Sequence, residues 1–231
     1  MSLRLLWQQI PSPLVSEILS YSSFDGVVLD AEHGCFNNET LYSCIQVISR
    51  RDRRAFVRVA TVDEEKVRMC LDAGATGIIF ANIESVDQIT KIHSICNYPS
   101  RGLGLVRENM WGHKALGIAA PIIIIQIESR KAIDQLPYIS KSNWNKLVDY
   151  YMIGPYDLSK SYGVAGDFEH RAVKAALTIF EECIPDEKKG YHLVKDWDEY
   201  CIKCRKYGMV AMGMDTTMLF EQIKLMENMI S

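Results

Sequence analysis

Short apolar segments recur along the chain at regular intervals, each followed by an amphipathic stretch. They occupy residues 3–9, 24–30, 54–59, 77–80, 121–128, 147–154, 188–194 and 209–214. These segments are four to eight residues long and rich in β-branched and aromatic side chains, which is typical of strands buried on both faces of a parallel sheet. This alternation constrains the fold most strongly, because repeated βα units imply a parallel sheet.

Helix-start signals precede several of the intervening stretches. Ser12-Pro13 places a capping residue before a proline at the first helical position. Thr61-Val62-Asp63-Glu64 and Ser85-Val86-Asp87-Gln88 match the capping-box pattern, in which two side chains satisfy free backbone N–H groups. The other helices are predicted at residues 38–51, 130–141, 168–183, 196–206 and 216–229.

Eight strands alternating with eight helices in 231 residues predict a single closed (β/α)8 TIM barrel domain spanning residues 1–231. An open, doubly wound sheet is the alternative. No glycine-rich GxGxxG turn follows the first predicted strand, so that alternative lacks support.

Composition excludes several other classes of protein. With 48% hydrophobic and 24% charged residues the chain is not of the disordered type. Its 26 basic against 29 acidic residues disfavour a nucleic-acid partner held through phosphates. The longest uncharged apolar run, about residues 115–127, is shorter than the roughly 18 residues of a membrane helix. No secretory leader pattern opens the chain, so we expect a cytoplasmic protein.

The seven cysteines are an odd number scattered along the chain, which favours reduced thiols over a disulfide framework. Cys201 and Cys204 form a lone CxxC pair. Because a zinc site needs a second pair of ligands, we interpret this pair as helix packing.

Polar side chains gather at the predicted C-terminal ends of four strands, where the active site of such a barrel lies. They are Asp30, Glu32 and His33 after the second segment, Arg58 in the third, Gln126 and Glu128 at the end of the fifth, and Asp157 after the sixth.

Glu128 and Asp157 follow two consecutive strands, which lie about 4.8 Å apart in a sheet. Two carboxylates that reach one point repel each other unless a cation lies between them or they share a proton. A hard divalent cation such as Mg²⁺ or Mn²⁺, with water or substrate oxygens completing its shell, fits this pair. The simpler alternative is that each carboxylate caps a helix or pairs with a lysine.

Arg58 ends a strand that is otherwise apolar. A guanidinium binds carboxylates in bidentate fashion and can neutralise a developing enolate oxygen; an ion pair with Glu32 or Asp72 is compatible with that role. His33 is the histidine at a strand end with carboxylates close by in sequence, so Asp30 or Glu32 could hold its tautomer and raise its basicity.

The segment 97–114 is too long for a simple helix-to-strand connection. Such loops often form lids or subunit contacts, and His113 within it could fold over the mouth of the barrel. The histidines His93, His170 and His192 have no comparable context.

Residues 24–34, FDGVVLDAEHG, resemble the signature "GfDfvviDmEHg" of the HpcH/HpaI aldolase family, which comprises class II, metal-dependent pyruvate aldolases. Further blocks similar to the family follow in order and cover nearly the whole chain. They are Val57-Arg58-Val59, Leu71-Asp72-Ala73-Gly74-Ala75, Tyr98-Pro99 with Arg101-Gly102-Leu103-Gly104, Gln126-Ile127-Glu128-Ser129, and Ile153-Gly154-Pro155-Tyr156-Asp157-Leu158-Ser159. The combination is specific, whereas no single block would be.

The resemblance implies a (β/α)8 barrel in a homo-oligomer, usually a hexamer in which neighbours exchange the last helix. It implies cleavage of a 4-hydroxy-2-oxoacid to pyruvate and an aldehyde, with a divalent cation, Mg²⁺ or Mn²⁺ and also Co²⁺ or Zn²⁺. The residues that match functional positions are Glu128 and Asp157 for the metal, Arg58 for the pyruvate oxygens, His33 with Asp30 for acid/base work, Gln126, Gly154 and Pro155 for the pyruvate surface, Trp7 near the mouth, and Asp72 by the subunit boundary.

This sequence departs from the family in three places. Phe80-Ala81 stands where relatives have Val-Pro, Gln9 stands where a glycine is expected, and the block before Arg101 is shortened. Two other functions are weighed: a lyase that acts on CoA thioesters, similar to citrate lyase β proteins, and a catalytically silent oligomeric subunit. The second would be expected to lack one of the four groups His33, Arg58, Glu128 and Asp157, and all are present.

Overall fold

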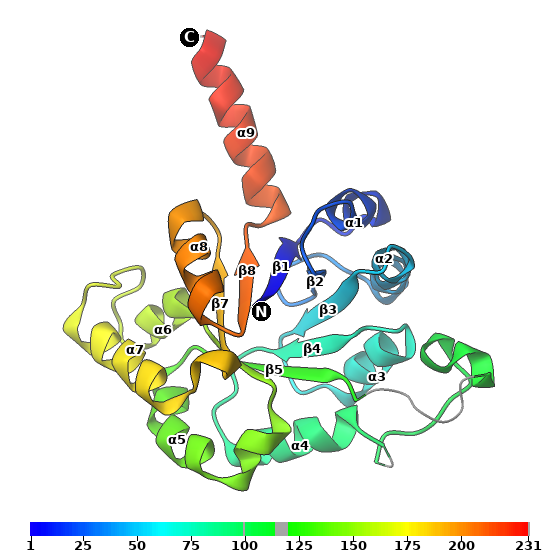
Figure 1. The fold of residues 1–231 in the computed structure, drawn as a ribbon, viewed down its shortest axis with the longest axis horizontal. Helices are drawn as coiled ribbons and strands as arrows, with labels where there is room; N and C mark the ends of the chain where they lie inside the picture. Colours follow the sequence, from blue (N-terminus) through cyan, green and yellow to red (C-terminus); the bar gives the residue numbers. More distant parts are fainter. Residues whose placement is uncertain (99, 114–119, 231) are drawn as a thin grey trace.

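The computed structural model describes residues 1–98, 100–113 and 120–230. Eight parallel strands close into a barrel in sequence order, which confirms the predicted (β/α)8 architecture (Figure 1). The strands are β1 (Leu3–Gln8), β2 (Gly26–Asp30), β3 (Arg54–Val59), β4 (Gly77–Phe80), β5 (Ile122–Ile127), β6 (Tyr150–Ile153), β7 (Lys189–Leu193) and β8 (Met209–Met212). Each falls within a predicted apolar segment, and pairing of β1 with β8 closes the ring.

The helices surround the barrel (Figure 1). They are α1 (Pro13–Ser20), α2 (Asn38–Arg50), α3 (Glu64–Asp72), α4 (Val86–Cys96), α5 (Arg130–Lys141), α6 (Pro155–Ser161), α7 (Arg171–Cys183), α8 (Trp197–Lys206) and α9 (Asp215–Ile230). Short 3-10 turns are η1 (Arg107–Gly112), η2 (Asn143–Leu147) and η3 (Asp186–Lys188). Helix α6 was not predicted, and α7 begins three residues later than expected.

The capping predictions have mixed outcomes. Ser12 is the N-cap of α1 and Pro13 its first residue, as expected. Ser85 Oγ accepts the Gln88 N–H, which confirms that cap. The cap of α3 is Asp63 instead of Thr61, because the Asp63 carboxylate accepts two N–H groups of the first turn. A carboxylate also gains more than a hydroxyl from the positive end of the helix dipole.

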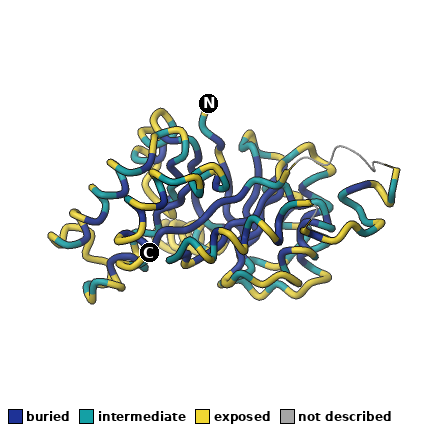
Figure 2. Tube along the Cα trace, turned by 90° about the horizontal axis from the view of Figure 1, so that it is seen from below, coloured by how far each residue is buried: buried dark blue, intermediate teal, exposed yellow. Residues whose placement is uncertain are grey.

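Alternate side chains of each strand face opposite sides of the barrel wall. One set, which includes Leu5, Val28, Phe56, Ile124 and Met152, fills the interior. The other set packs against the surrounding helices in a larger cluster that includes Val27, Leu29, Ala55, Val57 and Ile125. Figure 2 shows buried segments running through the centre of the molecule, with exposed residues along the outer helices.

The described part of segment 97–114 lies at the N-terminal ends of the strands. Trp111 and Met110 border a cavity together with Arg54 and Ile122, the first residues of β3 and β5. The active-site mouth lies at the opposite, C-terminal ends of the strands. The prediction that this segment and His113 fold over the mouth of their own barrel is therefore wrong. Pro99 and Lys114 lie outside the described residues.

Helix α9 points away from the barrel (Figure 1). Its first residue, Asp215, is buried, but the apolar side chains of the rest are exposed. The exposed set comprises Met218, Leu219, Phe220, Ile223, Leu225, Met226, Met229 and Ile230.

Within the described residues, no helix is long and apolar enough to cross a bilayer. All seven cysteines are free, while the predicted cytoplasmic location stays a prediction. Cys204 packs beside the small core cluster of Tyr200 and Tyr207, as interpreted, but its partner in the CxxC pair, Cys201, is exposed.

Candidate active site

The candidate site is built on the inward-facing positions just beyond the last apolar layer of the barrel. Two residues after Leu5, Val28, Phe56 and Ile124, which all face the interior, the chain places polar or aromatic side chains on the same side. They are Trp7, Asp30, Arg58 and Gln126, and Glu128 follows just past the end of β5. Strand pairing puts Asp30 directly opposite Arg58.

A cavity of about 480 Å³ opens at this end of the barrel. Seven of the nine site residues predicted from sequence line it. Lining residues are His33, Arg58, Gln126, Glu128, Gly154, Pro155 and Asp157. The other two, Trp7 and Asp30, lie behind Arg58.

The Asp30–Arg58 pair is the most buried ion pair at the site. Arg58 Nε donates to Asp30 Oδ1 at 2.9 Å and Arg58 Nη2 to Asp30 Oδ2 at 2.7 Å, a bidentate geometry that holds the guanidinium plane fixed. Arg58 Nη1 also lies 2.9 Å from Glu32 Oε2. The expected pair with Glu32 is therefore present, and the partner that sequence reasoning missed is Asp30.

Asp30 has no exposed surface. Burial acts to raise the pKa of this carboxyl, but the hydrogen bonds and charge of Arg58, with a bond from Trp7, outweigh it and hold the pKa at about 2. Its oxygens also accept the side-chain N–H of Gln9 at 3.2 Å and the backbone N–H of His33 at 3.2 Å. The Asp30 carboxylate is thus a permanent anion that fixes Arg58.

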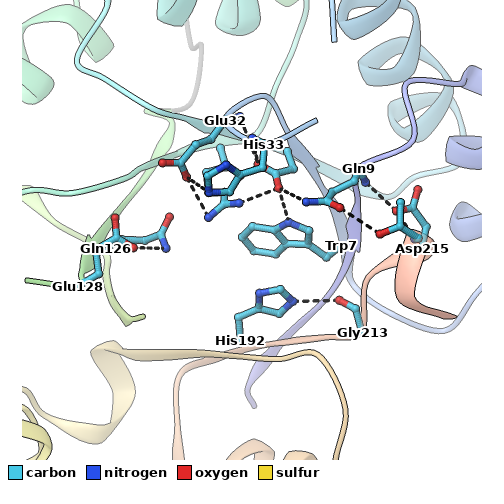
Figure 3. Close-up of polar contacts among 12 residues, drawn as sticks. Trp7, Gln9, Glu32, His33, Gln126, Glu128, His192, Gly213 and Asp215 are labelled. Carbon is cyan, nitrogen blue, oxygen red and sulfur yellow. Dashed lines mark hydrogen bonds and ion pairs between the residues drawn. The ribbon is translucent and has the colours of Figure 1, made fainter. Parts of the chain in front are cut away.

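Of the two carboxylates predicted to orient the imidazole of His33, Glu32 is the one that lies beside it. Asp30 contacts the His33 backbone, while the ring Nε2 lies 3.9 Å from Glu32 Oε2 and the side chain is 59% exposed. Asp30 is already saturated by stronger donors, so of the two carboxylates considered it is Glu32 that faces the ring (Figure 3).

Glu128 is held by neutral donors. Its Oε1 accepts the Asn82 backbone N–H at 2.7 Å and its Oε2 accepts the Gln126 amide at 3.0 Å. Burial raises the pKa of Glu128 to about 7, and the charges of Glu32 and Asp157 act in the same direction. Gly154 is required beside it, because a Cβ there would lie 2.9 Å from Glu128 Oε2.

Asp157 lies in the first turn of α6 and its side chain is 48% exposed. Lys160 Nζ is 3.8 Å from it, too long for a strong pair. The alternative in which lysine pairing or helix capping absorbs both carboxylates therefore fails for Glu128 and is weak for Asp157. Among the described residues no three His, Cys, Asp or Glu side chains cluster as ligands, so a cation here would draw its other ligands from water or substrate.

The donor set suits a hard cation. Glu128 and Asp157 offer carboxylate oxygens at one cavity, and the buried Gln126 Oε1 has no hydrogen-bond partner among the described residues. A buried carboxylate whose pKa is raised by neighbouring anions gains most from a positive charge. These observations fit Mg²⁺ or Mn²⁺, which prefer oxygen ligands.

His192 is a site residue that sequence reasoning set aside. It stacks on Trp7 with ring centroids 4.2 Å apart, and its Nε2 lies 2.9 Å from the Gly213 carbonyl oxygen (Figure 3). Gly190, two residues earlier, faces the barrel interior, since a Cβ there would meet Met209 and Met152. The two-residue alternation on β7 was the signal that could have found His192.

Gln9 and Asn82 were also missed as site residues. The Gln9 amide donates to Asp30 and accepts from the Thr216 hydroxyl at 3.0 Å. Asn82 has a left-handed backbone with φ 51°, a conformation that asparagine adopts more readily than most residues. Asn82 donates to Glu128 through its backbone N–H, so no side-chain motif in the sequence predicts this contact.

A closed (β/α)8 barrel with charged groups at the C-terminal ends of its strands is the architecture of TIM-barrel enzymes. The model of the HpcH/HpaI aldolase/citrate lyase family matches residues 4–219, and the chain belongs to that family. This membership confirms the resemblance of the sequence blocks.

An aldolase-named relative supports a carbon–carbon lyase, and two solved structures share the fold. A 4-hydroxy-2-oxo-heptane-1,7-dioate aldolase of Shigella boydii is 28% identical over 225 residues, covering 93% of this chain and 85% of the relative. A family member from Burkholderia cenocepacia has a similar structure, with TM-score 0.86, 22% identity, and coverage of 99% and 94%. A citrate synthase shares the fold, with TM-score 0.82, 23% identity, and coverage of 99% and 92%.

The substitution Asp30→Asn is expected to lower the free energy of unfolding by about 3 kcal/mol, because it leaves the buried Arg58 cation short of its main partner. Urea unfolding of the variant measures the loss. The double variant Asp30→Asn, Arg58→Met removes both charges and should recover part of it. If the free energy of unfolding of Asp30→Asn alone lies within about 0.5 kcal/mol of wild type, Asp30 is not the main partner of the buried Arg58 cation.

The same pair makes the free energy of unfolding depend on pH at the acid end. A folded-state pKa of about 2, below the ordinary 3.8, means that the contribution of Asp30 is complete above about pH 4 and is lost as the pH falls towards 2. The stability difference between wild type and Asp30→Asn should therefore narrow over that interval.

Proposed function

We propose that this protein is a divalent-metal-dependent aldolase that cleaves a 4-hydroxy-2-oxoacid reversibly to pyruvate and an aldehyde. The observation that carries the proposal is the convergence of two carboxylates, an arginine and a histidine on one cavity of about 480 Å³. Family membership and aldolase-named relatives support the same reaction class.

The reaction is a rearrangement of electron pairs without net oxidation. A base takes the proton of the C4 hydroxyl, and the O–H electron pair forms the aldehyde carbonyl as the C3–C4 bond breaks. The electron pair of that bond forms a double bond between C2 and C3, the π pair of the C2 carbonyl moves onto its oxygen, and a pyruvate enolate is left. C3 then accepts a proton, which gives pyruvate.

The pyruvate half is assigned to the wall formed by β3, β5 and β6. Arg58 points its guanidinium into the cavity, where it binds the carboxylate or the developing enolate oxygen. The Asp30 and Glu32 bonds prevent it from turning away. The Gln126 amide and the backbone at Gly154 and Pro155 form the rest of this surface.

His33 is assigned the proton-transfer role. Its ring lies in the cavity lining and is accessible to substrate. Glu32, 3.9 Å from Nε2, stabilises the ring once it is protonated. Asp30 contributes indirectly, because it holds the His33 backbone and Arg58 in place.

Glu128 and Asp157 are the residues that would hold the cation. When bound, a divalent cation supplies Lewis acidity that stabilises negative charge on the substrate oxygens. The all-oxygen donor set favours Mg²⁺ or Mn²⁺ over Zn²⁺ or Co²⁺.

The decisive measurement is pyruvate release from a panel of 4-hydroxy-2-oxoacids with Mg²⁺, Mn²⁺ or Co²⁺, repeated with EDTA. We expect at least one substrate to give release that the chelator abolishes. If no member of the panel does so, the aldolase proposal fails, and acyl-CoA substrates test the alternative lyase activity.

Three variants separate the assigned roles. Glu128→Ala and Asp157→Ala should lose Mn²⁺ affinity in calorimetry, whereas Arg58→Ala should keep that affinity but lose turnover by about 10²-fold or more, as removal of a charge-stabilising donor does elsewhere. Unchanged Mn²⁺ affinity in the first two would refute the ligand assignment. A near wild-type rate for Arg58→Ala would remove it from the mechanism.

Mn²⁺ affinity should depend on pH in a stated direction. The pKa of Glu128 is raised to about 7, so below that pH the carboxyl is protonated and cannot bind a cation without releasing its proton. We expect the affinity to rise with pH and to level off above about pH 8, while Glu128→Gln binds weakly at every pH. A flat profile in the wild type would contradict the raised pKa.

We further propose that the protein is a homo-oligomer that buries α9 against a second copy. The apolar side chains of α9 are largely exposed; Phe220 is 57% and Met229 81% exposed. A helix of 16 residues directed away from the barrel cannot bury this surface within its own chain (Figure 1). The hexamer implied by the family resemblance accommodates it.

Replacing apolar residues of α9 should therefore lower the molecular mass in solution. Phe220→Glu with Met226→Glu is expected to shift the mass in light scattering towards the monomer, because it puts charges into the buried interface. Gln222→Glu, an exposed polar position on the same helix, is the matched control. An unchanged mass for the double variant would exclude α9 from the interface.

A further inference from the structure

The wall of the cavity formed by β7 has no role in the pyruvate half of the proposed reaction. This wall comprises residues 191–196, with Phe168 and Met214 alongside. A cavity of about 480 Å³ is within the range of ligand pockets and exceeds the need of a three-carbon acid. The β7 wall therefore faces the remainder of the substrate, which is the aldehyde half.

His192 is the polar group that the barrel aims into this wall. Its ring lies flat against the Trp7 indole, with an interplanar angle of 13°, on the side away from Glu32 and His33 (Figure 3). Arg58 lies over the same indole, 4.9 Å from the ring to the guanidinium carbon. The stack on Trp7 fixes the plane of the ring, and the Gly213 bond fixes its rotation within that plane.

The hydrogen-bonding partners settle which ring nitrogen is protonated. The Gly213 carbonyl oxygen can only accept, so His192 Nε2 carries the proton and Nδ1 of the neutral ring carries a lone pair. Burial lowers the pKa of His192 to about 4, against the opposing effect of the Gly213 bond, so the ring is neutral at pH 7. Among the described residues, no donor is hydrogen-bonded to Nδ1, and His192 lines the cavity.

An acceptor that lacks a partner among the described residues, on a fixed ring that lines the cavity, selects for a donor. A hydroxyl group can donate to Nδ1, an alkyl group cannot, and a carboxylate is repelled by the lone pair. Once bound substrate has displaced water from Nδ1, leaving this acceptor without a partner costs more than the bond itself contributes. The subsite therefore discriminates against substrates that lack the donor.

We propose that His192 Nδ1 forms a subsite for a hydroxyl group on the aldehyde half, so that the preferred substrates are 4-hydroxy-2-oxoacids whose aldehyde fragment carries a further hydroxyl. This inference rests on the proposed aldolase function. It adds that one side chain of β7 determines which aldehyde fragment the enzyme prefers.

The test uses the reverse reaction, in which pyruvate and an aldehyde condense in the presence of Mn²⁺. Matched aldehydes are propionaldehyde against lactaldehyde and acetaldehyde against glycolaldehyde, with succinic semialdehyde as the carboxylate. Comparing variants within each pair cancels differences in intrinsic reactivity. The readout is kcat/KM for the aldehyde.

Three substitutions of His192 separate the contribution of Nδ1 from that of Nε2. His192→Phe keeps a ring on Trp7 and removes both; His192→Gln can keep the Gly213 bond and lacks the Nδ1 acceptor; His192→Asn can place an amide oxygen near the Nδ1 position. His93→Phe, on α4 and away from the cavity, is the matched control.

We expect the Phe and Gln variants to lose about tenfold in the hydroxylated-to-plain ratio of kcat/KM, the scale of one lost hydrogen bond at a site. His192→Asn and the His93 control should keep the ratio. If the Phe and Gln variants lower both members of a pair equally, or leave the ratio unchanged, His192 acts only through packing and the inference is overturned.

Exchange of the pyruvate methyl protons with D₂O, measured on the wild type with Mn²⁺ and no aldehyde, separates the two claims. Exchange with an unchanged aldehyde ratio overturns the inference and leaves the aldolase function standing. Absence of exchange and of condensation overturns both.

Discussion

The two-residue alternation of strands in a closed barrel is the constraint on which the site depends. Because the ring closes from β8 to β1, every second side chain of each strand must enter a crowded interior. The apolar layers end at the level of Val28, Phe56 and Ile124, and the next inward position on each strand carries a functional group. No loop is needed to aim Asp30, Arg58 or Gln126, so their placement is as rigid as the sheet.

The Asp30–Arg58 pair shows how the barrel tolerates charge at this depth. Removing two ions from water is costly, and the cost is met here by bidentate geometry and by extra donors from Trp7, Gln9 and the His33 backbone. Glu128, by contrast, is buried with only neutral donors, and burial together with the charges of Glu32 and Asp157 outweighs Arg58, so its pKa is raised where that of Asp30 is lowered. The mouth of the barrel thus holds one carboxylate, Asp30, whose charge is paired, and one, Glu128, that a bound cation would stabilise.

The strands and their order could be predicted from the sequence, because β-branched segments separated by amphipathic stretches allow few other folds. Helix α6 could not, since its seven residues, Pro155–Ser161, follow a glycine and resemble a loop. Sequence placed most charged site residues at the correct strand ends and named Glu32 as a partner for both Arg58 and His33, but it left alternatives open for each. Which carboxylate faces His33, and that Asn82 serves Glu128 through its backbone, depend on three-dimensional packing that carries no local pattern.

Gln9 connects the site to the helix that we assign to the oligomer interface. Asp215, the first residue of α9, accepts the backbone N–H groups of Gln9 and Ile10, while Thr216 donates to the Gln9 amide. That amide in turn donates to Asp30. A glycine at this position, as the family pattern has it, could not make the two amide contacts. In this chain the start of α9 and the Arg58 anchor therefore share one hydrogen-bond network. The proposed contact of α9 with a second copy would act on the geometry of the arginine through this network.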